Sequence, residues 1–97
     1  MKIEQFYNKN QFVIFDNKKT TFQSYDSTIA VIDKTKINND LTLGKDLNYS
    51  PTTLKHLYLF LKEYCNPVWC KVEDEPNKKV AIQKLIDNKT IKYNKNL

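Results

Sequence analysis

A strong helix start in the middle of the chain separates two kinds of sequence. Ser50 can accept a hydrogen bond from the first free amides of a helix, and Pro51 suits the first helical position, where no amide donor is needed. An apolar run follows at once, and Asn66 with Pro67 stops it. The pattern predicts the principal helix at about residues 51–65.

The principal helix is expected to lie on a sheet through one apolar stripe. Phe60 lies at the rim of this stripe, and Leu59 lies on the opposite side of the helix, where an isolated exposed Leu is the ordinary interpretation. The alternative is a small surface for a protein partner. The stripe consists of Leu54, Leu57, Tyr58, Leu61, Tyr64 and Cys65. The predicted partner patch consists of Lys55, His56, Leu59, Phe60 and Lys62.

The first half of the chain has the pattern of short strands joined by turns. Runs of β-forming residues between Asn, Asp and Lys clusters predict strands at residues 3–7, 11–15, 20–25, 28–33 and 41–43. The apolar run from Ile29 to Ile32 suits a central strand. Gly44 follows the last of these strands and is the residue that adopts a positive φ at least cost. A small antiparallel sheet is predicted.

The last third of the chain is expected to add a strand and a second helix. Residues 68–72 have strand character, and the acidic residues before Pro76 favour a helix start. The second helix is predicted at about residues 77–88, and residues 90–93 form a terminal strand or a loosely held tail. The fold class is therefore α+β, in one domain over residues 1–97, with a mostly antiparallel sheet of about four to six strands. The second helix's apolar stripe is Ala81, Ile82, Leu85 and Ile86.

Lysine alone supplies the positive charge, and the excess lies at the C-terminal end. All 16 basic residues are Lys, the formal net charge is +5, and residues 76–97 hold six Lys against one acidic residue. Bidentate reading of guanine by Arg is excluded. The Lys-rich end can meet phosphates or an acidic protein, or its Lys side chains are merely solvated. The predicted nucleic-acid or acidic-partner set is Lys78, Lys79, Lys84, Lys89, Lys92 and Tyr93, with Trp69 and Tyr49 able to stack on bases if they are not core residues.

No catalytic residue, metal site or cofactor is predicted. One Gly cannot build a phosphate-cradling loop. Cys65 and Cys70 have neither zinc-knuckle nor thioredoxin spacing, so we expect reduced, packed thiols. His56 lies too far along the helix from Cys65 to activate it, and capping explains Ser50 and Thr53. The chain is therefore not expected to be an enzyme.

The sequence does not have the features of a membrane or secreted protein. No apolar stretch approaches the ~20 residues of a membrane span, and the first residues lack the apolar centre of a secretion signal. We therefore expect the protein in the cytoplasm.

Two linked motifs resemble a known family. The first is Ser24-Tyr25-x-Ser27-x-Ile29-Ala30, and the second runs from Tyr49 and Ser50 through Thr52, Thr53 and His56 to Phe60 and Leu61. Over about residues 22–61 the chain resembles small proteins of Firmicute phages and plasmids, especially staphylococcal ones, which have no agreed biochemical activity. Related modules resemble inhibitors of CRISPR nucleases. The resemblance implies a host bacterial cell and carries over no catalytic residue.

Two classes of function follow as expectations. In the first, the protein is a non-enzymatic inhibitor from a mobile element that binds a host defence nuclease, either its protein surface or its guide RNA. The basic charge disfavours mimicry of DNA, because a phosphate mimic needs excess carboxylates. In the alternative, it is a small basic nucleic-acid-binding accessory protein with little sequence preference.

Overall fold

Five strands of a six-stranded sheet come first along the chain, the helices follow, and the sixth strand comes after the last helix. The computed structural model describes residues 2–36, 40–48 and 50–97. Its elements are β1 (Lys2–Phe6), β2 (Asn8–Phe15), β3 (Lys19–Ser24), β4 (Ser27–Asp33), β5 (Asp40–Leu43), the 3-10 helix η1 (Lys45–Asn48), α1 (Pro51–Tyr64), α2 (Asn66–Val72), α3 (Lys78–Asp87) and β6 (Lys92–Tyr93).

The strands lie in the sheet in their sequence order. Strands β1 to β5 form an antiparallel meander, and β6 pairs with β5 in parallel at the far edge. The predicted α+β class and mostly antiparallel sheet are confirmed, and the C-terminal segment is a short strand instead of a loose tail.

A β-bulge in the middle of the sheet explains the uninterrupted apolar run of β4. Phe22 pairs with Ala30 and the next residue, Gln23, pairs with Thr28, so Ile29 is an extra residue in its strand. A bulge breaks the alternation of side chains between the two faces. Ile29 and Ala30 are therefore both fully buried although they are adjacent.

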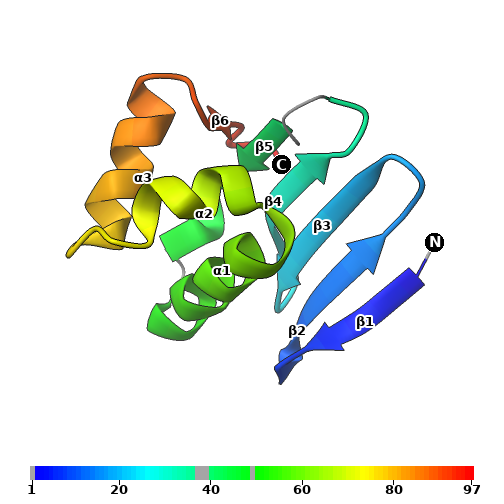
Figure 1. Cartoon of the computed structure of the whole chain (residues 1–97). Helices are drawn as coiled ribbons and strands as arrows, with labels where there is room; N and C mark the ends of the chain where they lie inside the picture. Colours follow the sequence, from blue (N-terminus) through cyan, green and yellow to red (C-terminus); the bar gives the residue numbers. More distant parts are fainter. Residues whose placement is uncertain (1, 37–39, 49) are drawn as a thin grey trace.

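The helices cover one face of the sheet. Figure 1 shows α1, α2 and α3 together on the same side of the strands. The contact between the layers is aromatic: the Phe22 and Phe60 rings stack with centroids 5.4 Å apart, and the Phe6 ring meets Phe60 edge-on at 6.4 Å. The sheet contributes Val13, Ile32, Leu41 and Leu43 to this core, and the helices contribute Leu57, Leu61, Val72 and Ile82.

Helix α1 begins as the sequence predicts. The Ser50 hydroxyl accepts a hydrogen bond from the Thr53 amide at 3.1 Å, and Pro51 occupies the first turn. Asn77 caps α3 in the same way, accepting from the Val80 amide at 3.2 Å. None of the helices in the described residues is long and apolar enough to cross a bilayer.

The prediction of a strand at residues 68–72 is wrong, because this segment forms α2. Pro67 lies in the first turn of α2, where its missing amide costs nothing. Val68 and Val72 then bury the same side of the helix in the core, and Trp69 packs half-buried beside them. Burial by tertiary contacts has overridden the β propensity of the segment.

Gly44 does not adopt the positive φ that is least costly for glycine. The positive φ values among described residues belong to Tyr7, Tyr25 and Lys89. Gly44 instead allows close approach of two chains, because a Cβ on it would lie 2.8 Å from the carbonyl oxygen of Thr28. Its amide donates to the Ile29 carbonyl at 2.8 Å, which joins the end of β5 to β4.

Gln11 on β2 is a polar residue buried in the core. Its side chain is fully buried, and among the described residues neither its Nε2 nor its Oε1 has a hydrogen-bond partner. A buried amide without partners carries an uncompensated desolvation cost.

Replacing Gln11 by Met is therefore expected to stabilise the protein. Gln11→Met keeps the length of the side chain and removes both polar atoms, so the free energy of unfolding should rise by about 1 kcal/mol in urea denaturation. The matched control is Gln5→Met on exposed β1, which should change it much less. A loss of stability in Gln11→Met would show that the amide is satisfied.

Candidate functional site

The face of the sheet turned away from the helices carries one cross-strand row of side chains. Strand register aligns Ile3, Ile14, Thr21, Val31 and Thr42 from β1 to β5. These residues alternate with the buried row that faces the helices, and four of them are half-buried while Ile3 is 59% exposed. We call this row, together with Phe12, the open face. It presents apolar and hydroxyl side chains to solvent in the middle of a rigid sheet.

A charged hollow lies at the β3–β6 end of the open face. Its volume is about 500 Å³, and Thr21, Val31 and Thr42 of the open face line its floor. Its charged lining residues are Lys19, Asp33, Lys36, Asp40 and Lys92. We call it the sheet hollow.

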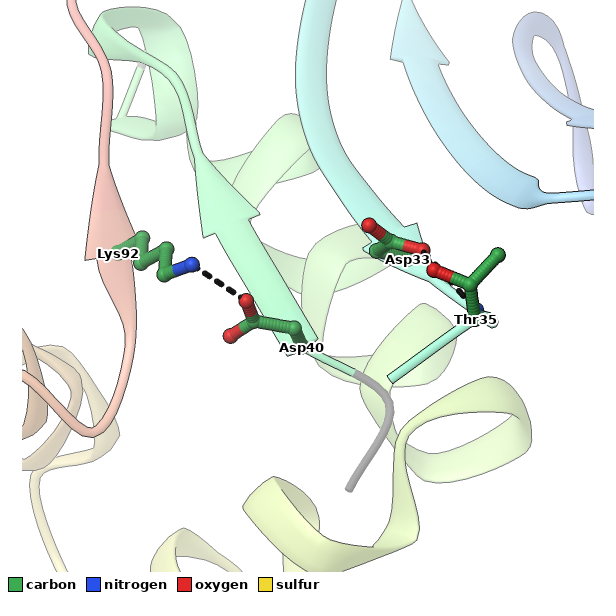
Figure 2. Close-up of polar contacts among 4 residues, drawn as sticks. All are labelled: Asp33, Thr35, Asp40 and Lys92. Atoms are coloured by element: carbon green, nitrogen blue, oxygen red, sulfur yellow. Dashed lines mark hydrogen bonds and ion pairs between the residues drawn. The ribbon is translucent and has the colours of Figure 1, made fainter. Parts of the chain in front are cut away.

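Two carboxylates of the sheet hollow lie opposite each other. Asp33 on β4 pairs in register with Asp40 on β5, an arrangement that repulsion disfavours. Figure 2 shows how each is compensated: Lys92 Nζ lies 2.5 Å from Asp40 Oδ2, and Asp33 Oδ1 accepts from the Thr35 hydroxyl at 2.6 Å and from the Thr35 amide at 2.9 Å. The Lys92 contact joins the two-residue strand β6 to β5.

These contacts shift two pKa values. The Thr35 hydroxyl and amide, which bind the ionised carboxylate, hold the pKa of Asp33 below its ordinary value. The hydrogen bond and charge of Asp40 raise the pKa of Lys92. Lys92 therefore keeps its charge at neutral pH, and its contact with Asp40 neutralises that charge in part.

A second hollow, which is basic, continues around the β6 edge. Its volume is about 600 Å³, and it shares Thr42, Lys92 and Asn94 with the sheet hollow. Its other lining residues are Ile86, Lys89, Ile91 and Tyr93. We call it the basic hollow. Among the described residues no acidic side chain lines it, in contrast to the sheet hollow.

The turn after α3 positions the two residues of the basic hollow best suited to a ligand. Lys89 adopts φ 66°, and its amide donates to the Ile86 carbonyl at 3.1 Å. The Ile91 amide then donates to the Leu85 carbonyl at 3.1 Å, which returns the chain to the sheet edge. Tyr93 is left 49% exposed on the same hollow as Lys89.

The structure brings part of the predicted Lys-rich set together and separates the rest. Lys89, Lys92 and Tyr93 line the basic hollow. Lys84 lines a different hollow with Lys71, between α2 and α3. Lys79 is exposed on α3 and lines none of these hollows.

The two aromatic residues proposed for stacking are placed differently. Trp69 is half-buried against the core, with Lys78 Nζ 6.0 Å from its ring centroid. Tyr49 lies outside the described residues.

The predicted partner patch on α1 does not form as expected. Phe60 is fully buried and His56 is only 7% exposed, so neither lies on the surface. Helix α1 is rotated so that Phe60 faces the sheet. Phe60 stacks on Phe22, and Thr53 Oγ1 lies 2.9 Å from Ser24 Oγ on β3. Leu59 packs partly buried on the core; the exposed members are Lys55 and Lys62.

The nucleophilic and basic side chains are dispersed. His56 Nδ1 lies 2.7 Å from the Thr52 carbonyl oxygen, under the rings of Phe6 and Tyr7. Within the described ranges neither cysteine forms a disulfide; burial raises the pKa of Cys65, whereas Cys70 is exposed and not packed as expected. Within the described ranges no three His, Cys, Asp or Glu residues are grouped to hold a metal ion.

The sequence does not predict the open face, because no local pattern shows which side of a strand the helices will cover. Ile3, Ile14 and Val31 look like core residues when they are considered one strand at a time. The missing information is the register of the sheet and the position of the bulge, which together place these residues in one row.

Comparison with known proteins finds a match to a family model. A family model described as a family of unknown function, DUF8033, matches residues 1–75 of the chain. No curated protein and no solved structure matches the chain. The matched segment contains the whole open face, while the basic hollow is built mostly from residues beyond it.

Removing the Thr35 hydroxyl tests the electrostatics of the sheet hollow. Thr35→Val keeps the shape of the side chain and both carboxylates, so the pKa of Asp33, followed by NMR, should rise toward its ordinary value. Because the folded-state pKa is depressed, the stability advantage of wild type over Thr35→Val should be present above about pH 4 and vanish as the pH falls through the folded pKa. An unchanged Asp33 titration would contradict this account.

Proposed function

We propose that this chain, which belongs to the DUF8033 family, acts by binding a partner and not by catalysis. The observation that supports this most is the continuity of two surfaces. The open face leads into the sheet hollow, which shares Thr42, Lys92 and Asn94 with the basic hollow. One partner can therefore contact a rigid sheet and a cationic edge together.

The two ends of this surface suit different chemistry. Asp33 and Asp40 offset two of the three lysine charges in the sheet hollow, which weakens its attraction for phosphate, while the hydroxyl and apolar residues of the open face suit a protein surface. Lys89 and Lys92 at the basic hollow attract anionic groups, and Tyr93 offers an exposed ring beside them. We propose a partner with both characters: a protein, or a protein with bound RNA.

The biological setting is a proposal of its own. The sequence motifs resemble proteins of Firmicute phages and plasmids, so we propose that the chain is an accessory protein of a mobile genetic element. The partner would then be a host defence nuclease of the CRISPR type, inhibited by occupation of its protein surface or guide RNA. The surplus of Lys supports this mode over mimicry of DNA, which requires a surplus of carboxylates.

Binding of nucleic acid alone is the second candidate. Tyr93 stacked on a base, with Lys89 and Lys92 on flanking phosphates, would give weak binding with little sequence preference. The exposure of Tyr93 on the basic hollow favours it. Lys92 is already paired with Asp40, however, so few cations are left for phosphates at this site.

Two substitutions separate these candidates. Val31→Lys changes the middle of the open face, and Lys89→Glu changes the basic hollow; Lys79→Glu is the matched charge control. We expect tagged wild type and Lys79→Glu to retain a protein from nuclease-treated lysate of a low-GC host, and Val31→Lys to lose it. Each variant is first shown by thermal denaturation to be folded.

The same variants give a measurement for nucleic acid. If Lys89 contacts a phosphate, Lys89→Glu should reduce the salt dependence of oligonucleotide binding by about one in log–log slope, with Val31→Lys unaffected. Recovery of nucleic acid alone, lost on nuclease treatment, would contradict the first candidate and support the second.

A further inference from the structure

Strand β1 leaves one edge of the sheet uncovered. It is the first strand in the sheet order, and residues 2–5 are all exposed. Figure 1 shows β1 as the outermost strand, with no element beyond it. An edge strand presents unpaired backbone amides and carbonyls, which are a template for pairing with another strand. The opposite edge is formed by β6, which has two residues.

The end of β1 is held in place by a side-chain contact. The Tyr7 hydroxyl donates a hydrogen bond to Glu63 on α1, and Tyr7 itself has φ 63° in the turn to β2. The pairing with β2 is irregular between Gln5 and Phe6. The regular, exposed part of the edge is therefore the segment from Lys2 to Gln5.

The charges of the segment from Lys2 to Gln5 are complementary to those of a second, antiparallel copy of the same segment. Lys2 Nζ and Glu4 Oε1 are 2.9 Å apart on one face of the strand, and Ile3 lies on the other face, in line with Ile14. When two copies of β1 pair antiparallel about a twofold axis through Ile3, Lys2 of each copy lies opposite Glu4 of the other. The two Ile3 side chains then lie opposite each other and join the open faces of both copies.

The charges also select this register. An axis through Glu4 would place Glu4 opposite Glu4, and an axis through Lys2 would place Lys2 opposite Lys2, and like charges in opposite positions destabilise a strand pair. The axis through Ile3 gives two opposite-charge pairs and an apolar pair. We propose that a second copy of this chain docks on β1 in this register, forming a symmetric dimer with one continuous sheet.

Such a dimer is expected to be weak and concentration-dependent. Pairing of four edge residues buries less surface than a standard stable interface of about 1,600 Å². It is therefore to be sought at high protein concentration, by sedimentation velocity from about 1 μM to 1 mM, a range that brackets weak association.

Charge reversal provides a sharp test. Lys2→Glu alone places Glu opposite Glu, and Glu4→Lys alone places Lys opposite Lys, so each single variant should dimerise at least about tenfold more weakly than wild type. An equimolar mixture of the two variants restores both opposite-charge pairs and should form a heterodimer about as tight as the wild-type dimer. Lys79→Glu, remote from β1, is the control and should dimerise like wild type.

The mixture keeps the proposal falsifiable even if one variant were less stable. The mixture contains the same two chains as the single-variant samples and differs from them only in which charges can meet across the dimer. A wild type that stays monomeric up to about 1 mM would overturn it, since that exceeds any concentration at which the dimer has meaning. Single variants that dimerise as well as wild type would also overturn it, as would a mixture that remains monomeric. The partner-capture experiments do not depend on this result, so the two proposals fail separately.

Discussion

The stacking of Phe60 on Phe22 determines which side of the sheet becomes the interior. The rings lie 5.4 Å apart between α1 and β3, and Phe6 closes the cluster from the edge hairpin. With α1 fixed there, α2 packs beside α1 and α3 beside α2 on the same side. Helices α1, α2 and α3 thus all pack on one face of the sheet, and the other face is exposed to solvent. The candidate binding surface is a direct result of this one-sided packing.

The open face and the basic hollow have different relations to the family. All residues of the open face lie within the segment matched by the family model, so a binding function shared within the family would use the sheet. The basic hollow depends on residues that follow α3 and on the Lys92–Asp40 contact with β5. We interpret the C-terminal segment as an extension that adds positive charge to the sheet's edge.

Local signals in the sequence predict most of the helices and strands, but they do not predict the binding surface. Ser50 and Pro51 predict the start of α1, and the apolar stripe of α3 is confirmed, because capping and periodicity are properties of neighbouring residues. The β propensity of residues 68–72 predicts a strand, but burial of Val68 and Val72 by distant residues makes the segment helical. His56 and Phe60 were expected on the surface for a similar reason: the rotation of α1 is set by Phe22 and Ser24, far away in the sequence.

The most direct test of the central claim is a lysine-labelling footprint of the protein in its captured complex. Acetylation of surface lysines, read by mass spectrometry, is compared between free and partner-bound protein. The proposed binding surface, which consists of the open face, the sheet hollow and the basic hollow, is predicted to be covered by the partner. Lys19, Lys36 and Lys89 should therefore be protected, while Lys55 and Lys62 on α1 stay reactive. Protection of Lys55 and Lys62 while Lys19 and Lys36 stay fully reactive would contradict the account. That result would show that the partner binds the helical side of the protein.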